Sequence, residues 1–337
     1  MRPDSDRLIG ESPAFLRTLE QVSQVAPLEK PVLIVGERGT GKELIASRLH
    51  FLSNRWEAHY LKMNCAAISE TIMESELFGH DAGAFTGATK SHQGRFERAH
   101  GGTLFLDELA TTSMRVQEKL LRVIEYGEFE RVGGSKTLTC NVRLIAATNQ
   151  DLPQLAQQGK FRSDLLDRLA FDVLTLPPLR EREEDILLLA EYFAINMAKE
   201  LGREFFAGFS PQIVHQLQTY PWPGNIRELK NVVERCVYRT DPEDLVEEII
   251  LDPFASPYRP LTEVADADAT PDVANGSRTS YPLDLKEHVK DMEVEIIEGA
   301  MEEAKHNQRK AAELLGLTYH QFRGYLKKYG MVGVSEE

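Results

Sequence analysis

The sequence is poor in cysteine and contains no long apolar run. Its three cysteines, Cys65, Cys140 and Cys236, stand far apart and form no CxxC pair. This spacing excludes a disulfide framework and a cysteine-based zinc site, and it predicts buried thiols. No stretch approaches the ~18 consecutive apolar residues of a membrane span, and the first residues lack the apolar core of a secretory signal. We therefore expect a cytoplasmic protein with no membrane insertion.

Basic residues are outnumbered by acidic ones. The chain has 39 Lys and Arg against 53 Asp and Glu, which gives a formal net charge of −14. This balance argues against a protein that coats nucleic acid with its whole surface. The stretch 305–329 is an exception, because it holds six Lys or Arg and one acid, Glu313. An acidic body with a basic segment near its C-terminus predicts local contact with nucleic acid.

Short β-branched runs alternate with amphipathic helical stretches through the first half of the chain. The runs lie at 31–37, 60–65, 102–108, 141–149 and 171–176. This alternation predicts an α/β domain over residues 1–176, with a mostly parallel sheet covered by helices on both faces. Residues 177–252 change to a helical pattern, with a helix over 185–199 and a second helix start at Ser210-Pro211. They predict a small helical subdomain.

Residues 253–283 are rich in Pro, Ala, Asp and Ser and have few large apolar side chains. They cannot bury enough surface to become ordered, so they predict a flexible linker. After the linker, Asp284 and Glu287 can form a capping box at the start of a helix. The helix has an apolar stripe that fits a dimer or core face, made of Leu285, Val289, Met292, Ile296 and Ala300.

A glycine-rich motif, GERGTGKE, lies between a β-run and a helical stretch. Its glycines let successive backbone N–H groups point at phosphate oxygens, and Lys42 supplies a positive charge. The two flanking elements disfavour the alternative of a plain glycine-rich turn. The usual final Ser or Thr is replaced by Glu43, so the usual Mg²⁺ ligand is missing. We expect ATP to contact Gly36, Glu37, Arg38, Gly39, Thr40, Gly41, Lys42 and Glu43.

A second motif, GGTLFLDE, ends a buried strand in two acids. Asp107 is suited to hold Mg²⁺ through water, and Glu108 to orient or deprotonate the attacking water. An acidic pair alone is usually a solvated strand end. Its partnership with Lys42 favours hydrolysis over mere binding.

The C-terminal segment 307–330 predicts two short helices joined at Gly316, with Thr318 and Gln321 capping the second helix. Its small core is predicted from Leu314, Leu315, Leu317, Phe322 and Leu326. A helix-turn-helix of this kind places its second helix in the major groove, and we assign residues 284–337 to DNA binding. A merely solvated basic hairpin is the alternative. The residues available for DNA contact are Thr318, Tyr319, His320, Arg323, Lys327 and Lys328.

The segment ESELFGHDAGAFTGA, Glu74–Ala88, closely resembles the loop that defines the sigma-54-dependent transcription activators of the AAA+ class. The resemblance continues through FLDELA, RVGG, ATN, FRSDLLDRL, LPPLRER and WPGNIREL, and the C-terminal hairpin resembles the Fis-type domain of many such activators. It implies an AAA+ P-loop ATPase with a helical lid, acting with ATP and Mg²⁺ in a hexameric ring. Such a ring remodels the closed sigma-54 RNA polymerase holoenzyme complex and binds enhancer DNA through a C-terminal dimer.

The resemblance also implies roles for single residues. Asn64 is similar to a switch that restrains Glu108, and Arg227 to a second sensor on the lid. Thr148 and Asn149 resemble sensors of the γ-phosphate. The GAFTGA segment would contact sigma-54 through Gly83, Ala84, Phe85, Thr86, Gly87 and Ala88, with the loop 131–134 moving beside it.

Two arginines, Arg162 and Arg168, resemble arginine fingers that enter the neighbouring subunit's site. They lie six residues apart and so share no face of a regular helix. One of them can instead form an intersubunit pair, and a surface salt bridge is the alternative for either.

Within the family, the chain is most similar to activators of phage shock genes, because its ATPase module begins near residue 8 without room for a receiver domain. We therefore expect control by a trans-acting inhibitor of the phage shock A type. Trp56 is a possible contact for it, with half-buried packing as the alternative. Two other functions are alternatives: a passive nucleotide-responsive repressor, disfavoured by Glu108 and the fingers, and an unfolding or clamp-loading machine, which has no need of GAFTGA.

Overall fold

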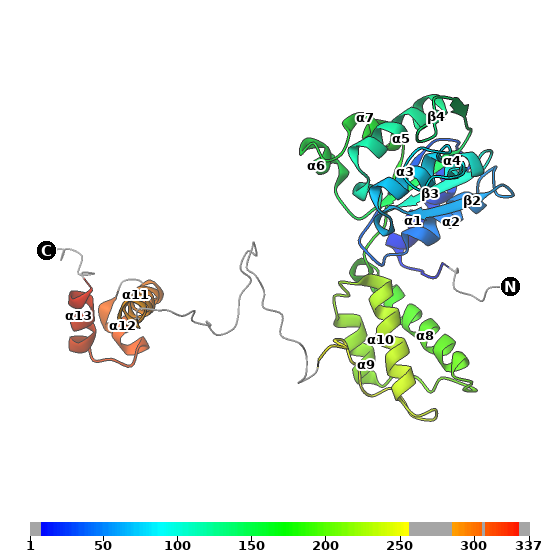
Figure 1. Ribbon diagram of the computed structural model, residues 1–337. Coiled ribbons are helices and arrows are strands. Elements are labelled where there is room, and N and C mark those ends of the chain that lie inside the picture. The colour runs from blue at the N-terminus through cyan, green and yellow to red at the C-terminus, as the bar shows by residue number, and fades with distance from the viewer. Residues whose placement is uncertain (1–7, 256–284, 305–306, 330–337) are drawn as a thin grey trace. The chain divides into compact units, whose positions relative to one another are not determined.

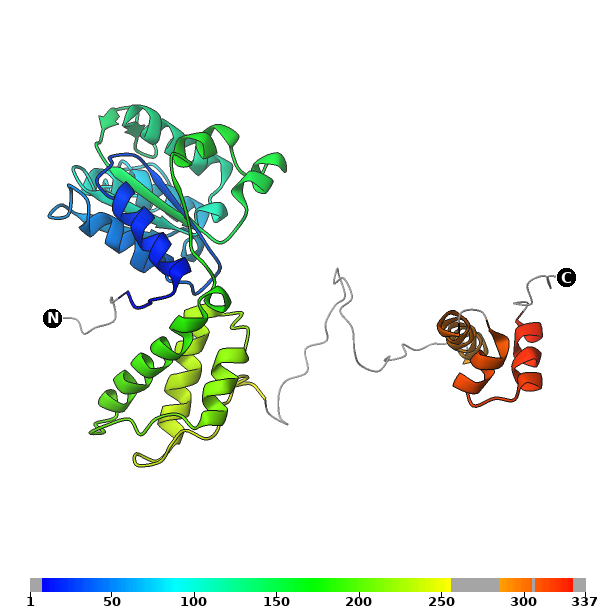
Figure 2. The same ribbon diagram turned by 180° about the vertical axis from the view of Figure 1, so that it is seen from behind.

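The computed structural model describes residues 8–255, 285–304 and 307–329 (Figures 1 and 2). The chain forms two compact units, Met1–Arg259 and Pro260–Glu337. From residue 256 on, the linker expected over 253–283 lies outside the described residues, as does Asp284 of the expected capping box. The side chains of its partner Glu287 and of Leu285, Val289 and Met292 in the apolar stripe also lie outside them.

A parallel sheet forms the centre of the first unit, as the sequence pattern predicts. Its strands run in the order β2-β3-β6-β1-β7 and pair in parallel. The carboxyl ends of parallel strands all lie at the same edge of the sheet. The segments that follow β1, β3 and β6 therefore lie close together at that edge. The strands are β1 (Val32–Val35), β2 (Tyr60–Asn64), β3 (Thr103–Asp107), β6 (Arg143–Thr148) and β7 (Val173–Thr175).

Helices cover both faces of this sheet because its inner strands are apolar on both sides. Val32 and Ile34 pack on one face with α1 (Pro13–Val25) and α2 (Lys42–Phe51). Leu33 packs on the other face with the remaining helices. Those are α3 (Glu70–Phe78), α4 (Arg95–Arg98), α5 (Met114–Tyr126), α6 (Leu152–Gln157) and α7 (Ser163–Leu169). A small antiparallel hairpin follows α5 and consists of β4 (Glu128–Glu130) and β5 (Thr137–Thr139).

A helical lid completes the first unit. It consists of α8 (Glu183–Glu200), α9 (Pro211–Thr219) and α10 (Asn225–Arg239) (Figure 1). Trp222 is fully buried between them and donates its indole N–H to the carbonyl of Leu217 at 2.8 Å. Ser210 caps α9 ahead of Pro211, as predicted.

The described residues of the second unit form three helices: α11 (Leu285–Glu303), α12 (Gln308–Leu314) and α13 (Tyr319–Lys328). Thr318 and Gln321 form the predicted capping box, and Gly316 has the positive φ of 64° that its turn requires. The core consists of Ile297, Ala300, Ala304, Ala311, Ala312, Phe322 and Leu326.

Two expectations about this core were only partly right. Leu314 was predicted to be buried, but its side chain is 55% exposed, and α11 contributes Ile297 instead. Ile296, from the expected apolar stripe, is 51% exposed, whereas Ala300 is buried. The dimer-face interpretation of the stripe stays a prediction.

Candidate nucleotide site and partner surfaces

A cavity of about 1010 Å³ opens between the sheet and the lid. It is lined by residues 39–42 of the glycine-rich loop and by Asp107 and Glu108. Its other residues include apolar side chains that come from the N-terminal segment and from the lid helices: Leu8, Ile9, Leu189, Phe193 and Ile226. The cavity therefore offers both charged and apolar surfaces, which suits a nucleotide.

Lys42 begins α2 and is only 8% exposed. Its ammonium donates to the carbonyl oxygens of Gly36 at 2.8 Å and Glu37 at 3.1 Å. Burial lowers the pKa of Lys42, and the carboxylates of Asp107 and Glu108 oppose that effect. A buried ammonium above a helix N-terminus creates a place for anionic phosphates.

Glu108 follows β3 in a left-handed conformation with a φ of 53°, which is uncommon for a non-glycine residue. The carboxylate of Asp107 accepts the N–H of Glu108 at 2.9 Å. The amide of Asn149, oriented to satisfy both neighbours, donates to Glu108 Oε2 at 2.8 Å and accepts from Arg38 Nε at 3.3 Å. Arg38 Nε also lies 4.0 Å from Glu108 Oε1. Several groups thus fix the direction of the Glu108 carboxylate.

Asn64 and Thr148 lie at the same sheet edge. The β2–β3 register pairs Asn64 with Asp107, and the Asn64 side chain accepts the N–H of Ala66 at 2.9 Å. Thr148 is buried, and its carbonyl accepts the N–H of Gly36 at 3.2 Å. Their roles as switch and sensor stay predictions.

A direct link between the phosphate loop and the lid was missed from the sequence. Asn225 is buried, has a φ of 53° and donates to Glu37 Oε2 and the Arg38 carbonyl, both at 3.0 Å. Arg180 donates twice to Glu37, at 3.0 and 2.7 Å, and together with Asn225 it lowers the pKa of Glu37. The Gly-Asn pair at the start of α10 was the available signal, since Asn tolerates a left-handed backbone.

The three arginines with predicted roles occupy different surroundings. Arg227 is exposed on α10 and lines the cavity. Arg162 forms a double hydrogen bond to Asp164, at 3.0 and 2.6 Å, and Arg168 pairs with Glu125 at 2.7 Å. Arg162 and Arg168 are not among the residues that line this chain's cavity.

The GAFTGA segment forms a tight turn between α3 and α4. Gly83 donates to the carbonyl of Ala88 at 2.7 Å, and Gly83 and Gly87 have φ values of 83° and 103°. Phe85 is 40% exposed and packs edge-on against His80, with ring centroids 4.9 Å apart. Gly83, Thr86 and Gly87 are exposed. The turn leaves an aromatic ring and a hydroxyl exposed at the surface.

The loop 131–134 contacts the GAFTGA turn. Arg131 binds both carboxylate oxygens of Glu97, at 2.9 and 2.6 Å, and Asp81 at 3.2 Å. A Cβ on Gly133 would lie 2.6 Å from the Cβ of Ala84, so a larger residue at 133 would displace the turn. The two loops therefore form one packed structure.

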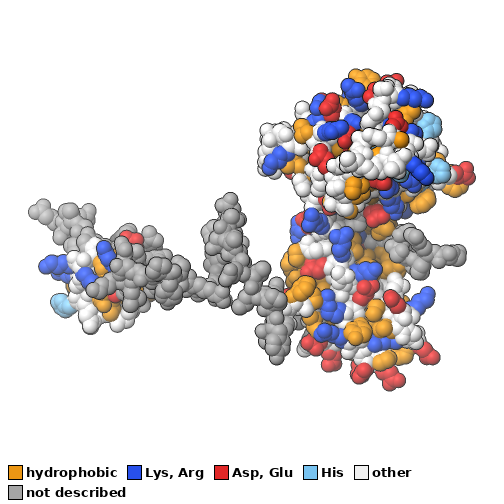
Figure 3. Space-filling view, in the orientation of Figure 1, with side chains coloured by type: hydrophobic (Ala, Val, Ile, Leu, Met, Phe, Trp, Pro, Cys, Tyr) orange, Lys and Arg blue, Asp and Glu red, His pale blue; other side chains and the backbone are white. Residues whose placement is uncertain are grey.

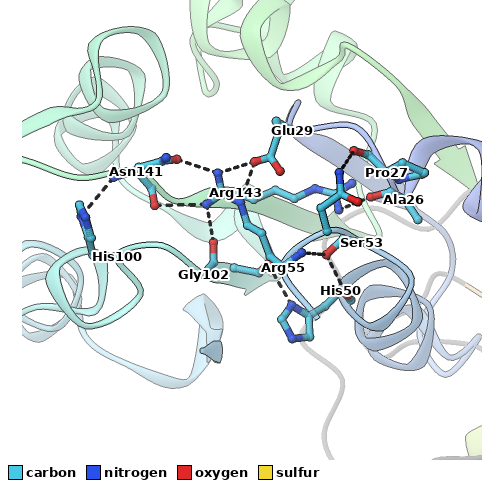
Figure 4. A network of polar contacts seen from close by, with 12 residues as sticks. Ala26, Pro27, Glu29, His50, Ser53, Arg55, His100, Gly102, Asn141 and Arg143 are labelled. Carbon is cyan, nitrogen blue, oxygen red and sulfur yellow. Dashed lines mark hydrogen bonds and ion pairs between the residues drawn. The ribbon is translucent and has the colours of Figure 1, made fainter. Parts of the chain in front are cut away.

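Trp56 is 57% exposed, so the alternative prediction of half-buried packing is wrong. Phe51 and Leu52 nearby in sequence are 62% and 45% exposed. Figure 4 shows how Arg55 anchors this segment: it donates to Glu29 at 2.6 Å, to the Gly102 carbonyl at 3.0 Å and to the Asn141 side chain at 2.7 Å. The anchored turn holds an exposed apolar surface.

The predicted DNA-contacting residues lie on or directly before α13. Exposed Lys and Arg side chains are visible on this unit in Figure 3. Arg323 and Lys327 are exposed, whereas Lys328 pairs with Glu293 at 3.2 Å. Thr318 caps the helix, Tyr319 is half-buried and His320 is exposed. The same helix therefore offers both polar and cationic groups.

A parallel sheet with a phosphate loop, an acidic strand end and a helical lid defines a P-loop nucleoside triphosphatase, here joined to a helix-turn-helix unit. Comparison with known families narrows the class. The sigma-54 interaction domain matches residues 8–175, the AAA+ ATPase lid domain 180–257 and the Fis family of bacterial regulatory proteins 288–329.

Individual relatives agree with these matches. The chain is 60% identical to the Psp operon transcriptional activator of Escherichia coli (strain K12), over 96% of this chain and 98% of that protein. It is 43% identical to the Nif-specific regulatory protein of Azotobacter vinelandii, over 93% of this chain but 57% of that protein. A crystal structure of NtrX from Brucella abortus in complex with ATP has 32% identity and a TM-score of 0.66, covering 98% of this chain and 70% of that one.

The chain belongs to the family of sigma-54-dependent transcription activators. It is an AAA+ ATPase that binds nucleotide, with sigma-54 and DNA as partners, and the family resemblance drawn from the GAFTGA segment is confirmed. Within the described ranges, no helix is both long enough and apolar enough to cross a membrane.

Proposed function

We propose that this chain activates phage shock genes, and that it hydrolyses ATP with Mg²⁺ in a hexameric ring whose active sites combine residues of two subunits. The 60% identity to a Psp operon activator over nearly its whole length supports the choice of genes. The position of Arg162 and Arg168, outside the cavity of their own chain, is the main observation in favour of shared sites.

Magnesium fits the donor groups of the cavity. The carboxylates of Asp107 and Glu43 line it together with Lys42, and Mg²⁺ is commonly bound by one or two carboxylates, substrate phosphates and waters. Glu43 accepts from Lys62 at 3.0 Å, so we assign the ion to Asp107, through water. When bound, Mg²⁺ would neutralise charge on the phosphates.

The protein groups supply the rest of the chemistry. Glu108 orients the attacking water and accepts its proton. Because Asn149, a proposed γ-phosphate sensor, donates to the Glu108 carboxylate, the direction of that carboxylate depends on the position of the sensor. Lys42, at the end of the loop, and Arg227, on the lid, bind the negatively charged phosphates. Thr148 acts as a second γ-phosphate sensor, and Asn64 restrains Glu108 between cycles.

Arg162 and Arg168 are expected to act in the neighbouring subunit's site. Their own carboxylate partners, Asp164 and Glu125, hold them until assembly offers a phosphoryl group. Replacing either finger by Ala should lower turnover by about a thousandfold, because a guanidinium stabilises charge on the transferring phosphoryl group. We would measure ATPase activity across protein concentrations, together with ring assembly.

Subunit mixing distinguishes action in trans from a surface salt bridge. Lys42→Ala lacks its own nucleotide site but keeps its fingers, whereas Arg168→Ala keeps its site but lacks a finger. When equal amounts of the two inactive variants assemble at random, about a quarter of the interfaces should combine an intact site with an intact finger and regain activity. The same test applies to Arg162→Ala. A finger variant with wild-type turnover and assembly would show that its arginine forms only a surface pair.

An inhibitor of the phage shock A type is expected to bind the exposed surface of Phe51, Leu52 and Trp56. Trp56→Ala should escape inhibition and keep uninhibited ATPase activity within about twofold, because Trp56 does not line the cavity. Phe205→Ala, on the lid, is the control, since Phe205 is 58% exposed. ATPase titration with the inhibitor measures both variants. Equal inhibition of Trp56→Ala and the wild type would exclude this surface.

The C-terminal unit is expected to bind enhancer DNA as a dimer. Its match to the Fis family supports this assignment. We assign α13 to the major groove, with Tyr319, His320 and Arg323 near base edges or the backbone, and Lys327 and Lys328 near phosphates. DNA binding places the ring near its promoter.

A further inference from the structure

A buried ion pair at the start of α8 connects the lid to the N-terminal segment of the chain. Asp185 is completely buried and Arg182 is 2% exposed, and Arg182 Nε donates to Asp185 Oδ2 at 2.7 Å. Removing two charges from water is costly, so a buried pair persists only when further bonds satisfy it. Those bonds come from residues 9–12, which precede α1.

Both members of the pair bind this segment. The Asp185 carboxylate accepts the N–H of Glu11 at 2.5 Å, and the N–H and hydroxyl of Ser12 at 2.9 and 2.7 Å. Arg182 donates to the carbonyl of Ile9 at 3.2 Å. Burial acts to raise the pKa of Asp185, but the bonds from Ser12, Glu11 and Arg182 outweigh it, so the carboxylate stays ionised.

Packing also restricts the segment. The Arg182 guanidinium lies 3.8 Å above the centre of the Phe15 ring. A Cβ on Gly10 would lie 2.5 Å from Phe15 and 2.8 Å from Asp185, so only glycine fits between them. These contacts hold the segment closely against the start of α8.

This position determines one wall of the nucleotide cavity. Leu8 and Ile9 line the cavity, as do Leu189 and Ile226 of the lid. Apolar walls suit the flat faces of a nucleobase, whereas the glycine-rich loop suits phosphates. The lid also holds the phosphate loop through Asn225 and Glu37. The lid therefore contacts both the phosphate loop and the segment whose Leu8 and Ile9 line the cavity.

We propose that Arg182 and Asp185 are positioning residues for the nucleobase: they fix residues 8–12 on the lid, so that the base-binding wall moves with the lid. This inference rests on the assignment of the cavity to ATP. Neither residue is among the groups assigned to the phosphates or the attacking water, so loss of the pair should weaken base binding and spare the chemical step.

Two serines provide a matched test. Ser12 and Ser210 both cap a helix that begins with proline, and each accepts the N–H three residues later at 3.4 Å. Only Ser12 also binds Asp185. Ser12→Ala should raise the KM for ATP about tenfold and keep kcat within about twofold. Ser210→Ala should change neither constant, although both variants lower the melting temperature by a few degrees.

Direct binding separates the base from the phosphates. Calorimetry with ADP and with inorganic tripolyphosphate should show that Ser12→Ala weakens ADP about tenfold and leaves tripolyphosphate unchanged. Equal weakening of both probes, or an unchanged ADP affinity, would overturn the proposal. These binding measurements need no turnover. If the protein binds ADP but does not hydrolyse ATP, the proposed function is contradicted, and the comparison of ADP with tripolyphosphate still tests this inference.

Discussion

Glu108→Gln is expected to bind ATP as tightly as the wild type and to hydrolyse it at least about a hundredfold more slowly. Glutamine has the same shape but cannot accept a proton from water. Its oxygen can still accept the Asn149 amide, which contacts Glu108 at 2.8 Å, so the site should keep its geometry. Phosphate release in a single turnover would measure the rate, and calorimetry the affinity for ATP.

The matched control for this change is Glu130→Gln. Glu130 is exposed on β4 and is not among the residues that line the cavity, so its loss of charge should leave both rate and affinity unchanged. Wild-type turnover by Glu108→Gln would remove the proposed base. A large loss of ATP affinity would instead assign Glu108 to nucleotide binding.

The sequence was sufficient to predict the position of Lys42, Asp107 and Glu108 because that position depends on topology alone. Apolar runs indicate inner strands, and the carboxyl ends of parallel strands share one edge. Lys42 follows β1 and Asp107 ends β3, so both must lie at that edge whatever the details of packing. No knowledge of side-chain contacts was needed.

Contacts with the lid could not be predicted in this way. Asn225 binds Glu37 across 188 positions of sequence, and Asp185 binds Ser12 across 173. Such pairs depend on how the lid docks, which periodicity does not encode. The same limit applies to Leu314 and Trp56, since an apolar side chain is buried only if a neighbouring element covers it. Arg55 anchors its turn and leaves Trp56 exposed.

Thr86→Ala is expected to keep ATPase activity within about twofold and to lose open-complex formation with sigma-54 polymerase. Thr86 is exposed on a turn closed by the bond between Gly83 and Ala88, and it does not line the cavity. Its loss should therefore remove a partner contact without altering the catalytic groups. Strand opening at a sigma-54 promoter, measured with ATP and with a non-hydrolysable analogue, tests this expectation.

Thr89→Ala is the matched control, because Thr89 is also exposed and lies just after the GAFTGA segment. It should open promoters normally. Promoter opening by Thr86→Ala at the wild-type level would exclude the hydroxyl from the sigma-54 contact. A parallel loss of ATPase activity would show that the substitution acts on hydrolysis, before that contact is made.

The effect of hydrolysis must be transmitted to this turn through packed groups. Arg131, bound to Glu97 and Asp81, joins the two loops. A ligand shifts such an assembly only if it binds two arrangements unequally. A non-hydrolysable analogue should therefore hold the turn in one arrangement and open no promoter.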